Sequence, residues 1–406
     1  MAGTREAQVE MLNPLARKMA QIAMCQRTSW DRVSVECMGE PYRIDSAPRD
    51  RARYDRAVST RRATISDVAR EAGVSASTAS VVFSGKTPTS EATRARVIAA
   101  AASLGYTGPD PRAASLRRGR SGIVGVVFDQ HLGTAFLDPV TTHMMDGLAD
   151  GVSRLGAALL LLRDDGVTVS EPSLHTAPID AAVLIGCSPR MRDSLEIVRG
   201  RGIPVVVVEG DAGEGIPQVL LDNAEAQREA ALHVAALGHR DVVIVTLPTD
   251  TARRRGWIAD DAEVRVDVTA DRLAGARAVF PDAPALAAAT SSIDEGAIAG
   301  RTIFADPDRR PTAVIAQSDL LAAGVIRAAE EAGLRVPHDV SVTGFDGVVV
   351  DGLAPHVLTT LVQPATAKGR AAGEAVAAML EDAEPSGLAL SCTFREGTTT
   401  APPSTR

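Results

Sequence analysis

The sequence predicts an α/β protein in which a small domain of three short helices precedes a larger, two-lobed, doubly wound domain with parallel sheets. Beyond Gly122, short apolar runs alternate with amphipathic stretches, a pattern typical of parallel strands covered by helices on both faces. A body of roughly 280 residues exceeds the size at which one core stops growing, so two lobes are expected, with a ligand groove between them. The predicted strands are Ile123 to Phe128, Ala158 to Leu162, Ala181 to Ile185, Val205 to Val208, Val242 to Thr246, Ala313 to Ala316 and Ser341 to Phe345.

Composition places the chain among soluble globular proteins. Hydrophobic residues make up 45% and charged residues 23% of the 406 residues, whereas aromatic residues make up only 3%. No apolar run approaches the roughly 18 residues of a membrane helix, and the charged N-terminal stretch does not resemble a secretion signal. We therefore expect a cytoplasmic protein without a membrane partner.

The cysteines do not predict a metal or disulfide site. They are scattered, without a CxxC pair or zinc-ligand spacing, at Cys25, Cys37, Cys187 and Cys392. We expect reduced thiols and no metal.

The charge is distributed unevenly. The segment from Arg61 to Arg120 contains ten basic and four acidic residues, a surplus of +6 in a chain with a net charge of -8. A basic module on an acidic body is typical of a protein that touches nucleic acid with one end only.

Residues 61–107 predict three helices around one small core. Thr64 can cap a first helix together with Asp67, and Gly73 can turn the chain toward a second helix that Ser75 caps and that runs to about Phe83. A third helix follows Ser90 and ends at Gly105.

The spacing of the first two helices is that of a helix-turn-helix, whose second helix reads base edges in the major groove. Ala79 and Val82 would pack inward, leaving a small, mostly polar outer face of Ala76, Ser77, Ser80 and Val81, flanked by Ser75 and Thr78. These six residues and Thr64 are the predicted DNA contacts of the helix-turn-helix. Hydroxyl groups can contact bases or phosphates, and Ala or Val can pack on a thymine methyl group. Three short helices alone also describe hairpins with no role in DNA binding, but the basic surplus and the adjacent linker favour DNA.

The remaining segments complete the domain plan. Residues 1–60 show no sustained period and are expected to be poorly ordered. Residues 108–120 form a hinge, in which the Ala-rich, basic stretch from Arg112 to Arg118 is expected to become helical only when supported. Residues 121–406 form the two-lobed domain, in which Pro248 to Ala270 lacks periodicity and is interpreted as a surface excursion.

The run from Thr64 to Ser80, together with Ser90 to Tyr106, resembles the N-terminal signature of the lactose-repressor family, and the resemblance extends to Pro403. It implies a symmetric dimer on a palindromic operator in double-stranded DNA. It further implies a hinge helix that includes Arg112 and Ala113, and a Leu116 that wedges between base pairs in the minor groove. A plain linker contact is the other interpretation of Leu116.

One departure concerns the operator sequence. Val81 stands where the family very often carries Arg, so this chain lacks a strong guanine contact. The operator cannot be inferred from relatives.

In the body, Leu237 to Arg240, Gly333 to Asp346 and Arg395 to Pro403 resemble the family's periplasmic-binding-protein-like effector domain. The match implies that Arg272 and Asp319 grip ligand hydroxyls, which suits a sugar or similar polyol. Gln363 and Phe136 are further candidates, the latter as a ring that stacks on a ligand. Three other interpretations stay open: Arg272 as a surface arginine, Asp319 or Ser318 as a helix cap, and Asp346 as part of a strand-end turn.

The acidic pair that the family usually carries after Gly-Phe is broken here, because Gly347 follows Asp346.

Enzyme motifs are missing, so we predict neither catalytic residues nor a cofactor. Ser84 to Thr87 imitates the end of a phosphate loop, but the required first glycine would fall on Ser80. The leading prediction is a ligand-controlled transcription regulator, in particular a dimeric repressor. The alternative is a sensory module whose degenerate helix-turn-helix no longer binds DNA.

Overall fold

The computed structural model describes residues 63–85, 87–108, 119–128, 132–164, 173–186, 190–385 and 387–404. These residues fall into two compact units that part between Thr107 and Gly108. The mixed α/β class with parallel sheets is confirmed.

The smaller unit contains α3 (Ile65–Glu71), α4 (Ala76–Ser84) and α5 (Glu91–Ser103). Each helix begins where its sequence predicts a cap: Thr64 and Asp67 form a reciprocal capping box, and Ser75 and Ser90 accept hydrogen bonds from the backbone N–H three residues ahead. The three helices enclose one apolar core of Val68, Ala69, Ala72, Ala79, Val82, Val97, Ala100 and Ala101.

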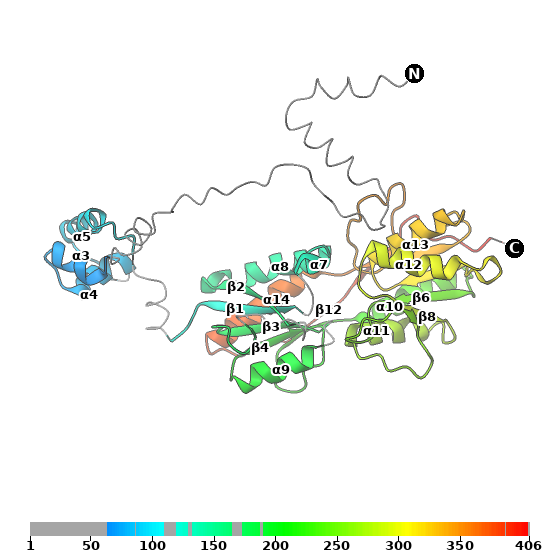
Figure 1. Ribbon diagram of the computed structural model, residues 1–406, viewed down its shortest axis with the longest axis horizontal. Helices are drawn as coiled ribbons and strands as arrows, with labels where there is room; N and C mark the ends of the chain where they lie inside the picture. The colour runs from blue at the N-terminus through cyan, green and yellow to red at the C-terminus, as the bar shows by residue number, and fades with distance from the viewer. Residues whose placement is uncertain are drawn as a thin grey trace, which may run out of the picture. The chain divides into compact units, whose positions relative to one another are not determined.

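The first lobe of the larger unit is built on a parallel six-stranded sheet with the order β12-β5-β4-β3-β1-β2. One face packs against α8 (Pro139–Val152) and α14 (Ala365–Leu380), and the other against α9 (Met191–Gly200) (Figure 1). The short α7 (Leu132–Ala135) precedes α8. The strands are β1 (Ile123–Phe128), β2 (Ala158–Arg163), β3 (Ala181–Ile185), β4 (Val205–Val208), β5 (Gln218–Leu221) and β12 (Leu388–Leu390).

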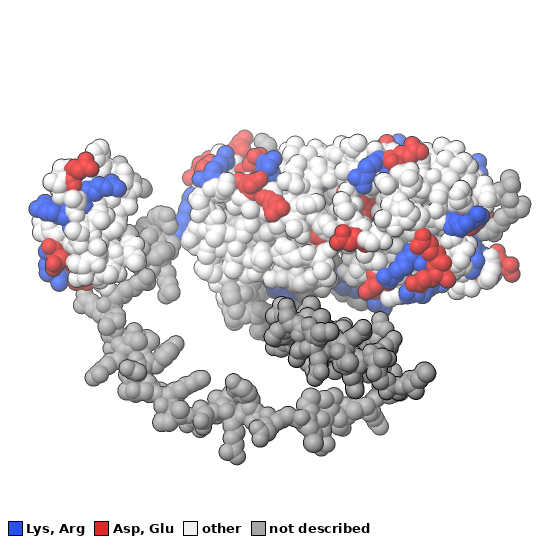
Figure 2. Space-filling model, turned by 90° about the horizontal axis from the view of Figure 1, so that it is seen from above, with Lys and Arg blue, Asp and Glu red and all other residues white. Residues whose placement is uncertain are grey.

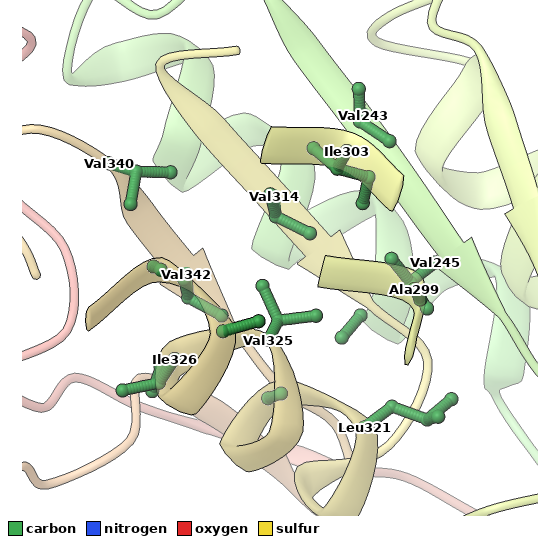
Figure 3. Packing of buried hydrophobic residues seen from close by; sticks show 14 of the residues in the cluster. Val243, Val245, Ala299, Ile303, Val314, Leu321, Val325, Ile326, Val340 and Val342 are labelled. Carbon is green, nitrogen blue, oxygen red and sulfur yellow. The ribbon is translucent and has the colours of Figure 1, made fainter. Parts of the chain in front are cut away.

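The second lobe has a five-stranded sheet with the order β10-β9-β6-β8-β7, parallel except for β7. The pair α12 (Ile293–Phe304) and α13 (Asp319–Glu331) covers one face, and α10 (Asn223–Ala236) with α11 (Asp267–Arg277) covers the other. Figure 3 shows side chains of α12 and α13, including Ile303 and Val325, meeting strand residues such as Val314. The strands are β6 (Val242–Thr246), β7 (Gly256–Trp257), β8 (Ala285–Ala287), β9 (Ala313–Ala316) and β10 (Ser341–Thr343).

The chain passes between the lobes at the junctions β5 to α10, β11 (Thr360–Val362) to α14, and β12 to β13 (Thr393–Arg395). Strands β11 and β13 pair antiparallel. The Asp222 carboxylate at the first passage accepts the N–H of Cys392 at the third, at 2.9 Å. The first and third passages are therefore hydrogen-bonded to each other.

Two local predictions need correction. Residues 248–265 are exposed or half-buried, in agreement with a surface excursion, but the predicted segment also contains β7, and its end forms the first turn of α11, which the buried Val266 and Val268 anchor. The last predicted strand ends at Thr343 rather than Phe345. The sequence also gave no sign of β5, β8 and β11 to β13, since runs of three or four residues carry too little pattern.

Candidate functional site

The outer surface of α4 is small and uncharged. Ser75, Ala76 and Ser77 are exposed, and Thr78, Ser80 and Val81 are half-buried at its edge. Ala79 and Val82 are buried against the other helices, as predicted. The Ser75 hydroxyl lies 2.8 Å from the hydroxyls of both Ser77 and Thr78, so hydrogen bonds link these groups at the start of α4.

Of the other predicted DNA contacts, the structure describes only Thr64. Thr64 is exposed next to α3, where its hydroxyl bonds the Asp67 carboxylate at 2.7 Å. Arg112, Ala113 and Leu116 lie outside the described residues. Their roles stay predictions.

Arg272 of α11 lies between the lobes and is only 3% exposed, so its interpretation as a surface arginine is wrong. Nε donates to Asn223 Oδ1 at 2.8 Å, and Nη1 donates to the Gln317 carbonyl at 2.7 Å. The guanidinium also stacks on the Phe345 ring at 3.6 Å from its centroid. The Asp346 carboxylate is the fourth neighbour and lies 3.6 Å from Nη1. These four groups together fix the orientation of the guanidinium.

A closed ring of polar side chains passes through Arg272 and joins both lobes. Asp346 Oδ1 accepts Gln363 Nε2 at 2.6 Å. Gln363 Oε1 accepts Lys368 Nζ, which also donates to Glu209 Oε2. Asn223 Nδ2 then donates to Glu209 Oε1 at 3.1 Å and completes the ring.

The charges of this ring are mutually dependent. Lys368 is fully buried. Burial of Glu209 opposes its ionisation, but Lys368, Arg272 and Asn223 together outweigh burial and lower the Glu209 pKa. Burial raises the pKa of Asp346 well above its ordinary value despite Arg272, because Asp138 and Asp319 add repulsion.

Two ring acids have unusual backbone conformations. Glu209 has a φ of 56° and Asp346 a φ of 122°, regions that non-glycine residues rarely adopt. Gly347 follows with a φ of 75°, and a Cβ there would lie 2.6 Å from the Cα of Val362. Only glycine fits, which explains why an acidic residue does not follow Asp346 in this chain.

Asp319 is fully buried at the start of α13 but does not cap it, because Ser318 accepts the N–H of Leu321 in that role. The Asp319 carboxylate instead accepts the Thr360 hydroxyl at 2.5 Å and the Val348 N–H at 2.8 Å. Burial raises its pKa to about 6. In this conformation Asp319 holds the loop that follows Asp346.

The segment before α8 in the first lobe carries two further side chains, of which Asp138 interacts with the charges of the ring. Asp138 caps α8 through Val140 N–H at 2.9 Å, and burial raises its pKa although Arg272 and Lys368 act against this. Phe136 is 39% exposed, and its ring centroid lies 5.9 Å from that of Phe128. The Phe136 ring is therefore partly accessible to solvent, and it lies close to Asp138 in the chain.

The structure brings two of the predicted ligand residues, Arg272 and Gln363, into the same ring of side chains. Asp319 is not a member of the ring and lies beside Asp346. Sequence patterns did not single out Asp138, Glu209, Asn223 and Lys368 as residues of this ring, and for Asp346 they left a strand-end turn as the interpretation. Glu209 follows β4 directly and Asp346 follows β10 closely, so their position at carboxyl ends of parallel strands was an available signal. Lys368 gave none, because it sits within an alanine-rich helix.

A cavity of about 240 Å³ adjoins the ring, lined by residues that include His143, Asp346, Val348 and Gln363. Among the described residues, no group of three or more His, Cys, Asp or Glu side chains could hold a metal ion. The arrangement offers hydrogen bonds and charge to a small polar molecule.

Comparison with known protein families matches two separate parts of the chain to two different families. Residues 64–108 match the family of bacterial regulatory proteins called the lacI family, and residues 231–400 match the periplasmic binding protein-like domain.

Relatives match most of the chain. An HTH-type transcriptional regulator of Mycobacterium tuberculosis is 32% identical over 328 residues, covering 77% of this chain and 90% of the relative. The HTH-type transcriptional regulator IpsA of Corynebacterium glutamicum is 31% identical over 364 residues, covering 84% and 98%.

Solved structures agree in fold. A LacI-family regulator from Corynebacterium glutamicum is 25% identical with a TM-score of 0.61, and covers 84% of this chain and 100% of its own. The lac repressor dimer bound to operator has a TM-score of 0.68 at 21% identity, with the same coverage.

A helix-turn-helix followed by a two-lobed periplasmic-binding-protein-like domain defines a DNA-binding transcriptional regulator rather than an enzyme. The chain belongs to the lacI family of bacterial regulators. No helix of the described part is long and apolar enough to span a membrane.

Proposed function

We propose that the protein is a dimeric repressor that binds a palindromic operator and is controlled by a small polyol, a sugar being the leading candidate, bound between the two lobes. The observation that carries the proposal is the interlobe ring, in which a fixed guanidinium and carboxylates converge. Hydroxyl groups both donate and accept hydrogen bonds, so they suit a site that offers both partners.

The ring leaves such partners open. Within the described residues, Arg272 Nη2 makes no hydrogen bond, while Nε and Nη1 do. Asp346 uses only Oδ1, and Asp138 only Oδ1. One donor and two acceptor oxygens thus remain around the ring.

Related structures support the ligand class and the dimer. One solved neighbour is a transcriptional regulator in complex with cellobiose, and another carries bound ribose. The lac repressor neighbour is a dimer on its operator, and the relative PurR of Proteus mirabilis is a transcriptional repressor. A palindromic site follows from two-fold symmetry of the protein.

Control of DNA binding follows from the arrangement of the ring across both lobes. A ligand that bonds groups of both lobes stabilises one relative position of the lobes over others. In a dimer this shifts the population between DNA-bound and free forms and orders or releases the hinge around Leu116. Whether the ligand releases or recruits DNA depends on which population it favours.

The test is selection of bound sequences from random duplex DNA by the purified full chain, with and without a panel of sugars and nucleobases. An enriched palindrome that one ligand removes or strengthens supports the proposal. If no DNA sequence is enriched although the protein is a folded dimer, the result supports the alternative function as a sensory module. The uncharged face around Val81 is the observation that favours this alternative. A steep fall of DNA affinity with salt excludes that module.

Two variants separate the functions. Leu116→Gly is expected to weaken operator binding and spare ligand binding, and Asp319→Ala to do the reverse. Wild-type behaviour of both variants would show the assigned roles to be wrong.

A further inference from the structure

We propose that the edge strand β7 is a docking surface for a second copy of this chain, which pairs with it antiparallel, Trp257 opposite the partner's Trp257. The inference goes beyond the proposed function, since it needs neither an operator nor a ligand. It concerns the excursion of residues 248–265, which contributes no member to the interlobe ring.

The outer edge of β7 has backbone groups that no neighbouring strand uses. Among the described strands, β7 pairs only with β8, antiparallel, with Trp257 opposite Leu286. The Ile258 N–H donates to the Ala285 carbonyl at 2.8 Å, so the backbone of Ile258 faces β8. Because hydrogen-bonded and non-hydrogen-bonded pairs alternate along an antiparallel ladder, the N–H and C=O of Trp257 point away from the sheet. An extended segment can therefore bond to both groups.

Trp257 also gives this edge an exposed aromatic ring. Its side chain is 52% exposed, and together with Ile298 of α12, which is 38% exposed, it lines a hollow of about 130 Å³ beside the strand. Aromatic side chains directly opposite each other on neighbouring strands stabilise an antiparallel pair. Tryptophan is also enriched where proteins meet.

The charges on either side of Trp257 identify the occupant as a second copy. Arg254 stands three residues before Trp257 and Asp260 three residues after it, and Arg253 and Asp261 stand four before and four after. Antiparallel pairing centred on Trp257 therefore places each arginine opposite an aspartate of the partner, in both directions. The segment is complementary in charge to a reversed copy of itself, as a two-fold symmetric contact requires.

These charged groups lie at the surface. The Arg254 side chain is 80% exposed, and Asp250 holds its Nη2 at 3.0 Å. Asp260 and Asp261 are exposed and form no ion pair with the part of the chain that the structure describes. Charged residues beside an edge strand ordinarily keep other strands away. A reversed copy is the exception here, because it brings the opposite charge to each position.

The edge is fixed before a partner arrives. Arg255 Nε donates to the two Glu295 oxygens at 2.9 and 2.8 Å, which ties the start of β7 to α12. The Arg265 N–H donates to the Thr249 carbonyl at 2.8 Å and closes the excursion at its base. Little backbone ordering has to accompany docking, which lowers its entropic cost.

The contact is too small to hold a stable dimer by itself. The paired stretch from Arg254 to Asp260 has seven residues, whereas stable interfaces have about 20–30 residues a side. We therefore assign it to a weak association step that joins two dimers of the proposed kind into a tetramer. On the face shown in Figure 2, Lys and Arg of the larger unit mostly lie beside Asp and Glu, so no field of one sign covers that face and opposes association.

The test is sedimentation velocity of the full chain over a range of concentrations, without DNA or ligand. Wild type should show a concentration-dependent step from dimer to tetramer. Arg254→Glu and Asp260→Arg each place like charges opposite each other twice in the symmetric contact, so each should weaken this step at least about tenfold. An equimolar mixture of the two variants should regain the step to within about threefold, because every reversed charge then meets its opposite.

Trp257→Ala is a further variant and should also weaken the step, since it removes the central pair of rings. The control is Arg309→Glu, which reverses an arginine with 88% of its side chain exposed outside the excursion and should leave the step unchanged.

Three results would overturn the inference while the proposed function stands. They are the absence of the step in wild type, wild-type association of both charge variants, and a mixture that does not recover, since the last excludes the antiparallel register. A charge variant that sediments as a monomer would overturn it too, because β7 would then hold the dimer itself. A chain that passes these tests but selects no operator would refute the proposed function alone.

Discussion

The pairing of Lys368 with Glu209 should be the most sensitive ionic contact of the larger unit. Lys368→Met keeps the length of the side chain but leaves the Glu209 carboxylate, with 9% of its side chain exposed, with the Asn223 hydrogen bond and the charge of Arg272 as its remaining support. Removing one partner of a buried ion pair costs about 3–5 kcal/mol. Replacing both partners costs far less, so the Lys368→Met, Glu209→Gln double variant should recover at least about 2 kcal/mol relative to the sum of the single effects.

The assay is urea unfolding of the full chain followed by far-ultraviolet circular dichroism, completed as a double-mutant cycle. The matched control is the exposed Arg301–Glu331 pair, whose removal should cost about 0–1 kcal/mol. Additivity of the two single variants within about 0.5 kcal/mol would refute the reasoning, because independent sites behave in that way.

Three other predictions test separate parts of the structure. Asp319 has a folded-state pKa of about 6 against 3.8 for the ordinary group, so the folded chain retains a proton that the unfolded chain has lost. Stability should therefore fall as pH rises from about 4 to 6, by roughly 3 kcal/mol from this residue, and unfolding of Asp319→Asn should lack that component. Gly369→Ala should destabilise by about 3 kcal/mol or more, since its Cβ would lie 1.8 Å from the Met144 carbonyl, whereas Gly200→Ala, with nothing within 4 Å, should be neutral or stabilising in thermal unfolding. Ser75→Ala should cost about 1 kcal/mol of cap energy and weaken operator affinity in a gel-shift titration; unchanged affinity would argue against α4 as the reading helix.

The helices of the small unit could be predicted almost to the residue. Their signals are local, because Thr64, Ser75 and Ser90 cap helices through bonds three residues away. The long apolar strands were equally accessible, since runs such as Val205–Val208 are buried on both faces. Strands of three residues, such as β8, obtain their hydrogen bonds from neighbours distant in sequence and were missed.

The interlobe ring shows the opposite case. Arg272 could be singled out, but the other members of the ring come from α10 and α14 and from the segments that follow β4, β10 and β11, which the two-lobed topology brings together. Asp319 was expected at the ligand, and only the tertiary structure turned its carboxylate toward Thr360 and Val348. A fully buried lysine is stable only beside a partner, and no sequence pattern links Lys368 to a glutamate 159 residues earlier.

The sequence by itself determined the order of the domains, the helix-turn-helix with the uncharged face of its second helix, and the doubly wound character of the body, because each depends on short-range periodicity and capping. Only the tertiary structure decided which acids surround Arg272, why Gly347 must be glycine, and that Lys368 is paired with Glu209. These properties depend on passages of the chain between lobes, where residues far apart in sequence share one desolvated space.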